Sequence, residues 1–168
     1  MEQRIGPRPR PSIYPLWAWL QWRGIAHRKP DLCSPGHLPD GTRGVRLACE
    51  VSDDQLLLSD FQLWHVPLNY GYLALTEAED KAFEAELVSH GIVDTPGEPL
   101  SDPIYHQRIL DSWEPIFDLD TVHSKDWLGG ETREEKSIQA TFWSLSLSQV
   151  REVTVFTSRR SRWTPCDL

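Results

Sequence analysis

The stretch from Leu56 to Tyr72, LLLSDFQLWHVPLNYGY, constrains the fold more than any other part of this sequence. Its three consecutive leucines predict the end of a short buried strand. Ser59 and Gln62 have the spacing of a capping box, so we expect a helical turn to begin at Asp60. Pro67 should then end or kink that helix. The stretch therefore predicts a strand, a turn and a short helix, with polar side chains set among apolar ones.

Asp60 and His65 are the two polar residues of this stretch whose side chains could take part in catalysis. On a helical turn that begins at Asp60, His65 shares its face with Phe61 and not with Asp60, so a direct catalytic pair is not expected. The simpler interpretation is that Asp60 caps the helix start and that His65 satisfies a buried carbonyl. The sequence contains no Gly-x-Ser-x-Gly or Walker-type loop.

Alternating apolar and polar residues predict further strands, a stretch that is apolar on both faces predicts a buried strand at Ile13–Trp22, and capping signals predict helices. The strands are expected at Ile13–Trp22, Val45–Val51, Ser137–Leu145 and Val153–Thr157, and Ile116–Leu119 also fits a short strand. Thr76 with Glu79 predicts a capped helix over Glu77–His90, and Asp102 before Pro103 predicts a helix that reaches Trp113.

We therefore expect an α+β fold in which about five strands form one small mixed or antiparallel sheet with two to three helices. A chain of 168 residues is most simply one domain, residues 1–168, and polar, aperiodic residues 1–12 and 159–168 should be loose tails. Four of the eight tryptophans lie on apolar stretches, so we expect Trp17, Trp19, Trp64 and Trp143 to be mostly buried in one contiguous core.

The charge distribution limits the classes of partner. The net charge is -8, with the acidic residues concentrated between residues 31 and 150 and a basic segment before them. This acidic body argues against a broad nucleic-acid surface and suits a basic partner. No apolar run approaches the roughly 20 residues that span a bilayer, so no membrane contact is expected.

The N-terminus and the cysteines point to the cytoplasm. MEQRIGPRPRP lacks the apolar core of a signal peptide. The three cysteines are odd in number and far apart, unlike a disulfide framework. Cys33 and His37 have the spacing of half a zinc site, but no second pair follows, so no metal is expected.

Four motifs together carry a resemblance: IYPLWAWLQW, LLLSDFQLWHVPLN, SWEPIFDL and SIQATFWSLSLSQVREVTVF. With them the chain resembles a bacterial family, the domain-of-unknown-function family three-eight-four-one, over residues 3–158. The resemblance implies no settled activity. Relatives begin with a further strand–helix segment that this sequence lacks, and Pro67 stands where they tend to have an aliphatic residue.

An enzymatic hypothesis comes from fold-level analogy. The strand–turn–strand at residues 137–157 and the opening segment of relatives look like the layout of ADP-ribosyltransferase-like folds, which bind NAD between two small sheets. There an acid on a late strand stabilises an oxocarbenium-like centre. Gln139 stands at the corresponding position, and glutamine cannot act as a base or offset positive charge. NAD is thus the alternative cofactor, in an enzyme or toxin-like domain that Gln139 would leave inactive.

The main hypothesis is a module that binds a small ligand or a protein and needs no cofactor. Aromatic residues are where binding energy concentrates, and polar residues embedded in apolar motifs suggest one pocket, with Asp60 or His65 near Gln139. The alternative is that each polar residue separately satisfies nearby backbone groups. The candidate ligand-binding residues are Trp17, Trp19, Asp60, Trp64, His65, Asn69, Gln139 and Trp143. The oligomeric state is left open.

Overall fold

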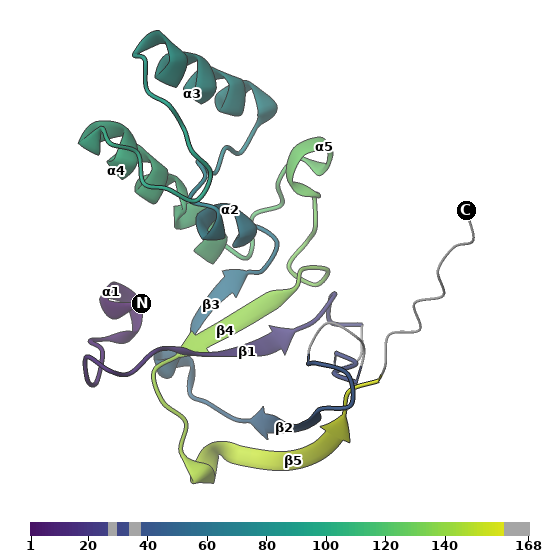
Figure 1. Cartoon of the computed structure of the whole chain (residues 1–168). Coiled ribbons are helices and arrows are strands. Elements are labelled where there is room, and N and C mark those ends of the chain that lie inside the picture. The colour runs from purple at the N-terminus through teal and green to yellow at the C-terminus, as the bar shows by residue number, and fades with distance from the viewer. Residues whose placement is uncertain (27–29, 34–37, 160–168) are drawn as a thin grey trace. The chain divides into compact units, whose positions relative to one another are not determined.

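The computed structural model of the chain describes residues 1–26, 30–33 and 38–159 (Figure 1). Among these residues there are five strands and five α-helices, of which only two exceed a single turn. The strands are β1 (Leu16–Gln21), β2 (Arg43–Cys49), β3 (Leu57–Asp60), β4 (Ile138–Phe142) and β5 (Val150–Thr157). The α-helices are α1 (Glu2–Ile5), α2 (His65–Leu68), α3 (Glu77–Ser89), α4 (Pro103–Ser112) and α5 (Lys125–Leu128). The expected α+β class is confirmed.

The strands form two sheets, where the sequence suggested one. One sheet has the order β1-β4-β3, and the other consists of β2 and β5. The chain divides into two compact units: the first is Met1–Leu16, Lys29–Leu56 and Phe142–Leu168, and the second is Trp17–Arg28 with Leu57–Thr141. That residues 1–168 form one domain stays a prediction.

The first unit is built on the antiparallel pair β2–β5. Val45 lies opposite Val155, and Leu47 lies opposite Val153. Both strands were expected, and these four apolar side chains lie on the exposed face of the pair. Both β2 and β5 are edge strands, since each has one neighbour among the described residues. The alternation of apolar residues in these two segments therefore indicates a strand, but it does not indicate that the apolar face is buried.

Residues 1–12, expected to be loose, contain the single-turn helix α1. Trp143 donates its indole N–H to the carbonyl of Gly6, 3.0 Å away, and the Arg8 guanidinium lies 5.7 Å from the centre of the Trp143 ring. Residues 160–168 of the expected C-terminal tail lie outside the described residues.

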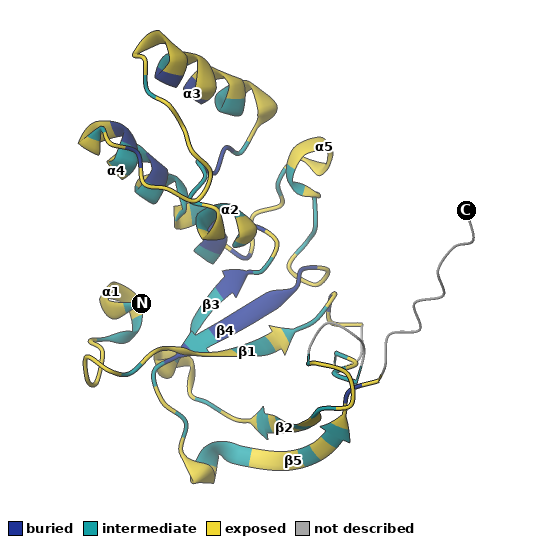
Figure 2. Cartoon of the chain, in the orientation of Figure 1, coloured by how far each residue is buried: buried dark blue, intermediate teal, exposed yellow. Residues whose placement is uncertain are grey.

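The second unit holds the three-stranded sheet. Strand β4 lies between β1 and β3, and its residues are the most buried of any strand (Figure 2). In the antiparallel β3–β4 pair, Ser59 lies opposite Gln139 and Asp60 opposite Ile138. A central strand has neighbours on both sides, which explains why even the polar Gln139 is buried.

Two helices follow their sequence signals closely. Helix α3 begins after Thr76, whose hydroxyl accepts from the backbone N–H of Glu79, and α4 begins after Asp102, which accepts from the N–H of Ile104. The buried core of this unit has two clusters: Phe83, Leu87, Leu100, Tyr105 and Ile109 form one, and Leu63, Leu73 and Ile116 form the other. The helix predictions are confirmed.

Three local predictions were wrong. Ile116 belongs to a 3-10 helix, Glu114–Phe117, and not to a strand, because Pro115 removes a ladder donor there. The side chain that caps the turn after β3 is Asp60, not Ser59, because Ser59 still lies within the strand. Trp17 is 50% exposed, because it lies on the edge strand β1.

Candidate functional site

Asp60 ends β3 with its carboxylate buried. One oxygen accepts from the backbone N–H groups of Gln62 (2.9 Å) and Leu63 (3.4 Å), which starts the turn toward α2. The other oxygen lies 3.4 Å from the Lys136 ammonium. The capping role expected for Asp60 is present, together with an ion pair that the sequence did not suggest.

Lys136 is a buried charged residue that the sequence did not single out. Its ammonium donates to the carbonyls of Leu119 (3.2 Å) and Thr121 (2.9 Å) as well as facing Asp60. Lysine is almost never fully buried unless it is paired. Its position directly before the apolar strand β4 was the available signal.

Gln139 lies on the central strand and is 2% exposed. Its side-chain oxygen accepts a hydrogen bond from the indole N–H of Trp17. Because opposed residues of an antiparallel pair share a face, Gln139 shares its face with Ser59, whereas Asp60 shares the other face with Ile138. Asp60 and Gln139 are thus neighbours along the ladder whose side chains leave the sheet on opposite sides.

Several aromatic residues meet on the Gln139 side of the sheet. The ring centres of Trp17 and Trp19 are 4.7 Å apart, those of Trp19 and Phe61 4.6 Å, and those of Phe61 and His65 4.9 Å. The expected Phe61–His65 face is confirmed. The His65 ring nitrogen Nδ1 lies 3.1 Å from the Gln62 carbonyl, so His65 does satisfy a backbone group.

The remaining candidates do not join this cluster. Trp64 packs against the core cluster of Leu63, Leu73 and Ile116. Asn69 caps the C-terminal end of α2, and its side-chain amide donates to the backbone carbonyl of His65 at 2.8 Å. Trp143 belongs to the other unit, where its indole N–H donates to the Gly6 carbonyl, so a single core that holds all four tryptophans stays a prediction. A ligand-binding role for any of the eight candidates stays a prediction.

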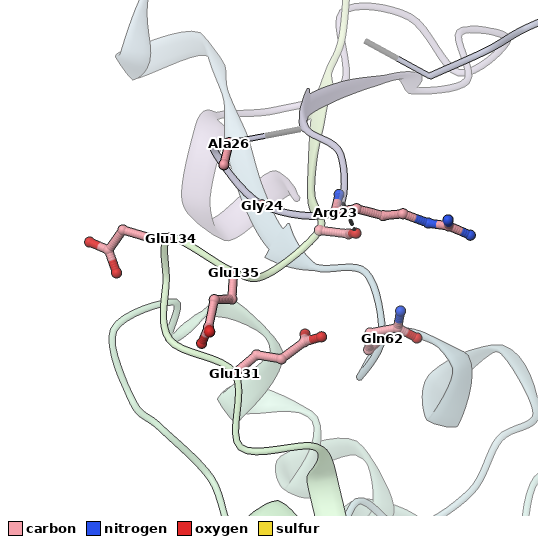
Figure 3. A pocket seen from close by; sticks show the side chains of 8 residues that line it. Arg23, Gly24, Ala26, Gln62, Glu131, Glu134 and Glu135 are labelled. Carbon is pink, nitrogen blue, oxygen red and sulfur yellow. Dashed lines mark hydrogen bonds between the residues drawn. The ribbon is translucent and has the colours of Figure 1, made fainter. Parts of the chain in front are cut away.

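The structure places a cleft elsewhere in the second unit, where the chain leaves β1. It has a volume of about 430 Å³. Its lining residues are Arg23, Gly24, Ala26, Gln62, Glu131, Glu134, Glu135 and Ser137 (Figure 3). Of these, only Gln62 lies inside the stretch from Leu56 to Tyr72.

Backbone hydrogen bonds hold one wall of the cleft. Gly24 donates to the Lys136 carbonyl at 3.2 Å, and Ile25 donates to the Glu134 carbonyl at 2.7 Å. Gly24 has a φ of +87°, and a Cβ there would lie 2.8 Å from the Glu134 carbonyl oxygen. Only glycine fits this approach without strain.

The charges of the cleft are unevenly compensated. Burial, together with the negative charges of Asp60 and Glu135, raises the pKa of Glu131, and Lys136 opposes this only in part. Hydrogen bonds from Thr132 lower the pKa of Glu135. Figure 3 shows Glu131 extending toward Gln62, whereas Glu134 turns away from the other carboxylates. Among the three glutamates of the cleft, Glu131 is thus the one whose negative charge is disfavoured by burial and by neighbouring carboxylates.

His123 lies near the buried ion pair. Its Nε2 is buried and has no hydrogen-bond partner among the described residues. Burial is the main reason why the pKa of His123 is lowered. The positive charge of Lys136 lowers this pKa further, and the negative charge of Asp60 acts in the opposite direction. These residues form no metal site, since no cluster of three or more potential ligands is found within residues 1–26, 30–33 and 38–159. His37 of the half zinc motif lies outside those ranges.

The family model of a domain of unknown function, DUF3841, matches residues 1–151. The chain belongs to this family. The resemblance seen in the four motifs is thereby confirmed. No curated protein and no solved structure is detectably similar to the chain. Within the described part of this DUF3841 protein, none of the helices has the length and apolar character needed to span a bilayer.

Proposed function

We propose that this DUF3841 protein is a binding module whose cleft takes a small organic cation. The observation that carries the proposal is the Glu131 carboxyl, which lines the cleft and has no hydrogen-bond or ion-pair partner among the described residues. A volume of about 430 Å³ lies within the range of small-molecule sites, ~300–1,000 Å³.

The charge balance supports a cation over an anion. Three glutamates and one arginine line the cleft. In Figure 3 the Arg23 side chain extends away from Glu131 and Glu135, and its guanidinium lies 5.3 Å from the centre of the Trp22 ring. A bound cation near Glu131 would offset the repulsion from Asp60 and Glu135 that raises the pKa of Glu131.

The hydrogen-bonding groups favour a ligand with several N–H donors. The Gln62 side chain, toward which Glu131 extends in Figure 3, carries an amide oxygen that can accept a hydrogen bond. The Ser137 hydroxyl oxygen accepts from the backbone N–H of Arg23 at 3.0 Å, which holds this side chain in place. Acceptors beside an uncompensated carboxylate suit a primary amine or a guanidinium, which donate without accepting.

An NAD-dependent activity receives less support. Gln139, the residue on which that alternative rests, is buried, and its side-chain oxygen is engaged by the Trp17 indole. Gln139 is not among the residues that line the cleft. We therefore propose binding in preference to transfer chemistry.

The test is a calorimetric titration of the full chain with putrescine and agmatine, with choline as a cation that lacks N–H donors and NAD as the anionic comparison. We expect at least one amine to bind and NAD to give no heat. Glu131→Gln should weaken amine binding by about tenfold or more, because a charge pair is lost, which corresponds to about 1.4 kcal/mol. Glu134→Gln is the matched control and should change the affinity by less than about threefold, since Glu134 turns away. Binding of NAD alone, or equal effects of both variants, would contradict the proposal.

A further inference from the structure

Strand β1 presents a free edge with large exposed apolar side chains. In the sheet order β1-β4-β3 this strand has one neighbour, β4, among the described residues. Leu16 is 42% exposed, Trp17 50% and Leu20 55%. Exposed edges are normally protected by charge or by proline, because they pair readily with another strand. From Leu16 to Leu20 this edge has neither.

The sequence of the edge reads the same in both directions. Residues 16–20 are Leu-Trp-Ala-Trp-Leu, a palindrome centred on Ala18. If two copies of β1 pair antiparallel about a two-fold axis at Ala18, Leu16 lies opposite the second Leu20, and Trp17 lies opposite the second Trp19. Residues opposite each other in such a pair share a face of the sheet. Each side chain would then meet one of its own kind.

Self-complementarity of this type is what a symmetric dimer requires, because the same patch must serve on both subunits. The leucines would pair on one face of the sheet and the tryptophans on the other, with the small Ala18 at the axis. Aromatic pairs and apolar pairs across strands each stabilise a sheet. Pro15, which lacks a backbone donor, would end the pairing at the first residue of the strand.

From the free edge and the palindrome we infer that two copies of this chain associate through β1, which joins their three-stranded sheets into one. We take the partner to be a second copy of this chain, because the palindrome makes the edge complementary to itself at each of its five positions. The residues involved do not line the cleft. The association is thus independent of cation binding.

The experiment measures molecular mass in solution by sedimentation over a range of concentrations. A pairing of five residues per chain is small, so we expect a dissociation constant of about micromolar or weaker, and the series should extend to roughly 200 μM. The full chain should form dimers within this range. A chain that stays monomeric throughout would overturn the inference.

Two double variants at the same positions test the register. Leu16→Lys with Leu20→Lys sets like charges opposite each other and should raise the dissociation constant by about tenfold or more. Leu16→Glu with Leu20→Lys sets each Glu opposite a Lys of the second copy and should restore the dimer. These side chains are exposed, so far-UV circular dichroism should show both variants folded. Equal masses for the two variants would overturn the register.

A third variant tests the place of contact. Val45→Lys with Val155→Lys alters the exposed apolar face of β2–β5 and should leave the dimer intact. Loss of the dimer in this variant, with retention in the Leu16→Lys, Leu20→Lys variant, would assign the contact to β2–β5 and overturn the inference.

Discussion

The Lys136 ammonium lies 3.4 Å from the Asp60 carboxylate, and these side chains are 2% and 5% exposed. The pair ties the end of β3 to the residues just before β4. Two backbone carbonyls satisfy the remaining protons of the ammonium, from Leu119 and Thr121. Removing one residue of such a buried ion pair should strongly destabilise the folded state, because the other charge stays buried without a partner.

Lys136→Met should therefore destabilise the protein by about 3–5 kcal/mol, because it leaves the Asp60 charge buried without a counterion. Denaturant melts followed by circular dichroism measure this. Adding Asp60→Asn, which keeps the capping oxygen, should recover part of the loss. Lys81→Met is the control, and since the Lys81–Glu77 pair is exposed it should cost less than about 1 kcal/mol. A loss for Lys136→Met no larger than this would refute the structural role.

Local signals in the sequence were sufficient for most elements. Thr76 and Asp102 are side chains that cap their own helices, and such bonds depend only on nearby residues. The alternation of Val45 and Leu47 likewise predicted a strand. Whether that strand is covered depends on the rest of the fold, and these side chains are exposed.

The cleft could not be predicted for the same reason. Its walls come from segments more than a hundred residues apart, joined by bonds such as that from Gly24 to the Lys136 carbonyl. Glu131 and Glu135 lie in a polar stretch of the sequence, and nothing local marks them as cleft residues. The sequence did mark Asp60 and Gln139 as polar residues among apolar ones, and the β3–β4 register of the structure brings them to adjacent positions of the sheet. The sequence did not show that they point to opposite faces.

Gly24→Ala should disturb the cleft wall. The residue has a φ of +87°, and the added Cβ would lie 2.8 Å from a backbone oxygen, which cannot move freely. We expect a loss of about 1–3 kcal/mol in the free energy of unfolding. Gly97→Ala is matched in conformation, with a φ of +84°, but its Cβ meets nothing within 4 Å. It should lose less, and equal losses in thermal melts would show that the close approach is unimportant.

The Tyr72 phenol should lose its proton at a higher pH than an ordinary tyrosine. Burial and a 2.7 Å hydrogen bond to the Glu79 carboxylate raise its pKa from 10.0 to about 12. Folding thus favours the neutral phenol, so this stabilisation is complete below pH 10.0 and declines as the pH rises toward about 12. Absorbance at the phenolate band should show a late step that Tyr72→Phe removes. Glu79→Gln should move the step to lower pH, and an unchanged step would argue against the Glu79 contribution.

Glu131 and Glu135 should give opposite pH dependences of stability. The raised pKa of Glu131 means that the folded state holds this proton more tightly than the unfolded state. There is no penalty below the ordinary value of 4.5, and a penalty grows as the pH rises through the folded-state pKa. Near neutral pH, Glu131→Gln should stabilise the protein by less than about 1 kcal/mol, because water screens the cleft.

The pKa of Glu135 is lowered, so the effect of its ionisation on stability has the opposite sign to that of Glu131. Its hydrogen bonds from Thr132 favour the carboxylate, so its stabilisation is present above 4.5 and is lost as the pH falls through the lower folded-state pKa. Glu135→Gln should therefore destabilise the protein near neutral pH and have little effect in acid. Thermal melts of both variants across acidic and neutral pH measure the two trends. If Glu131→Gln and Glu135→Gln shift stability in the same direction near neutral pH, the uneven compensation of charge in the cleft is wrong, and the case for a cationic ligand loses its support.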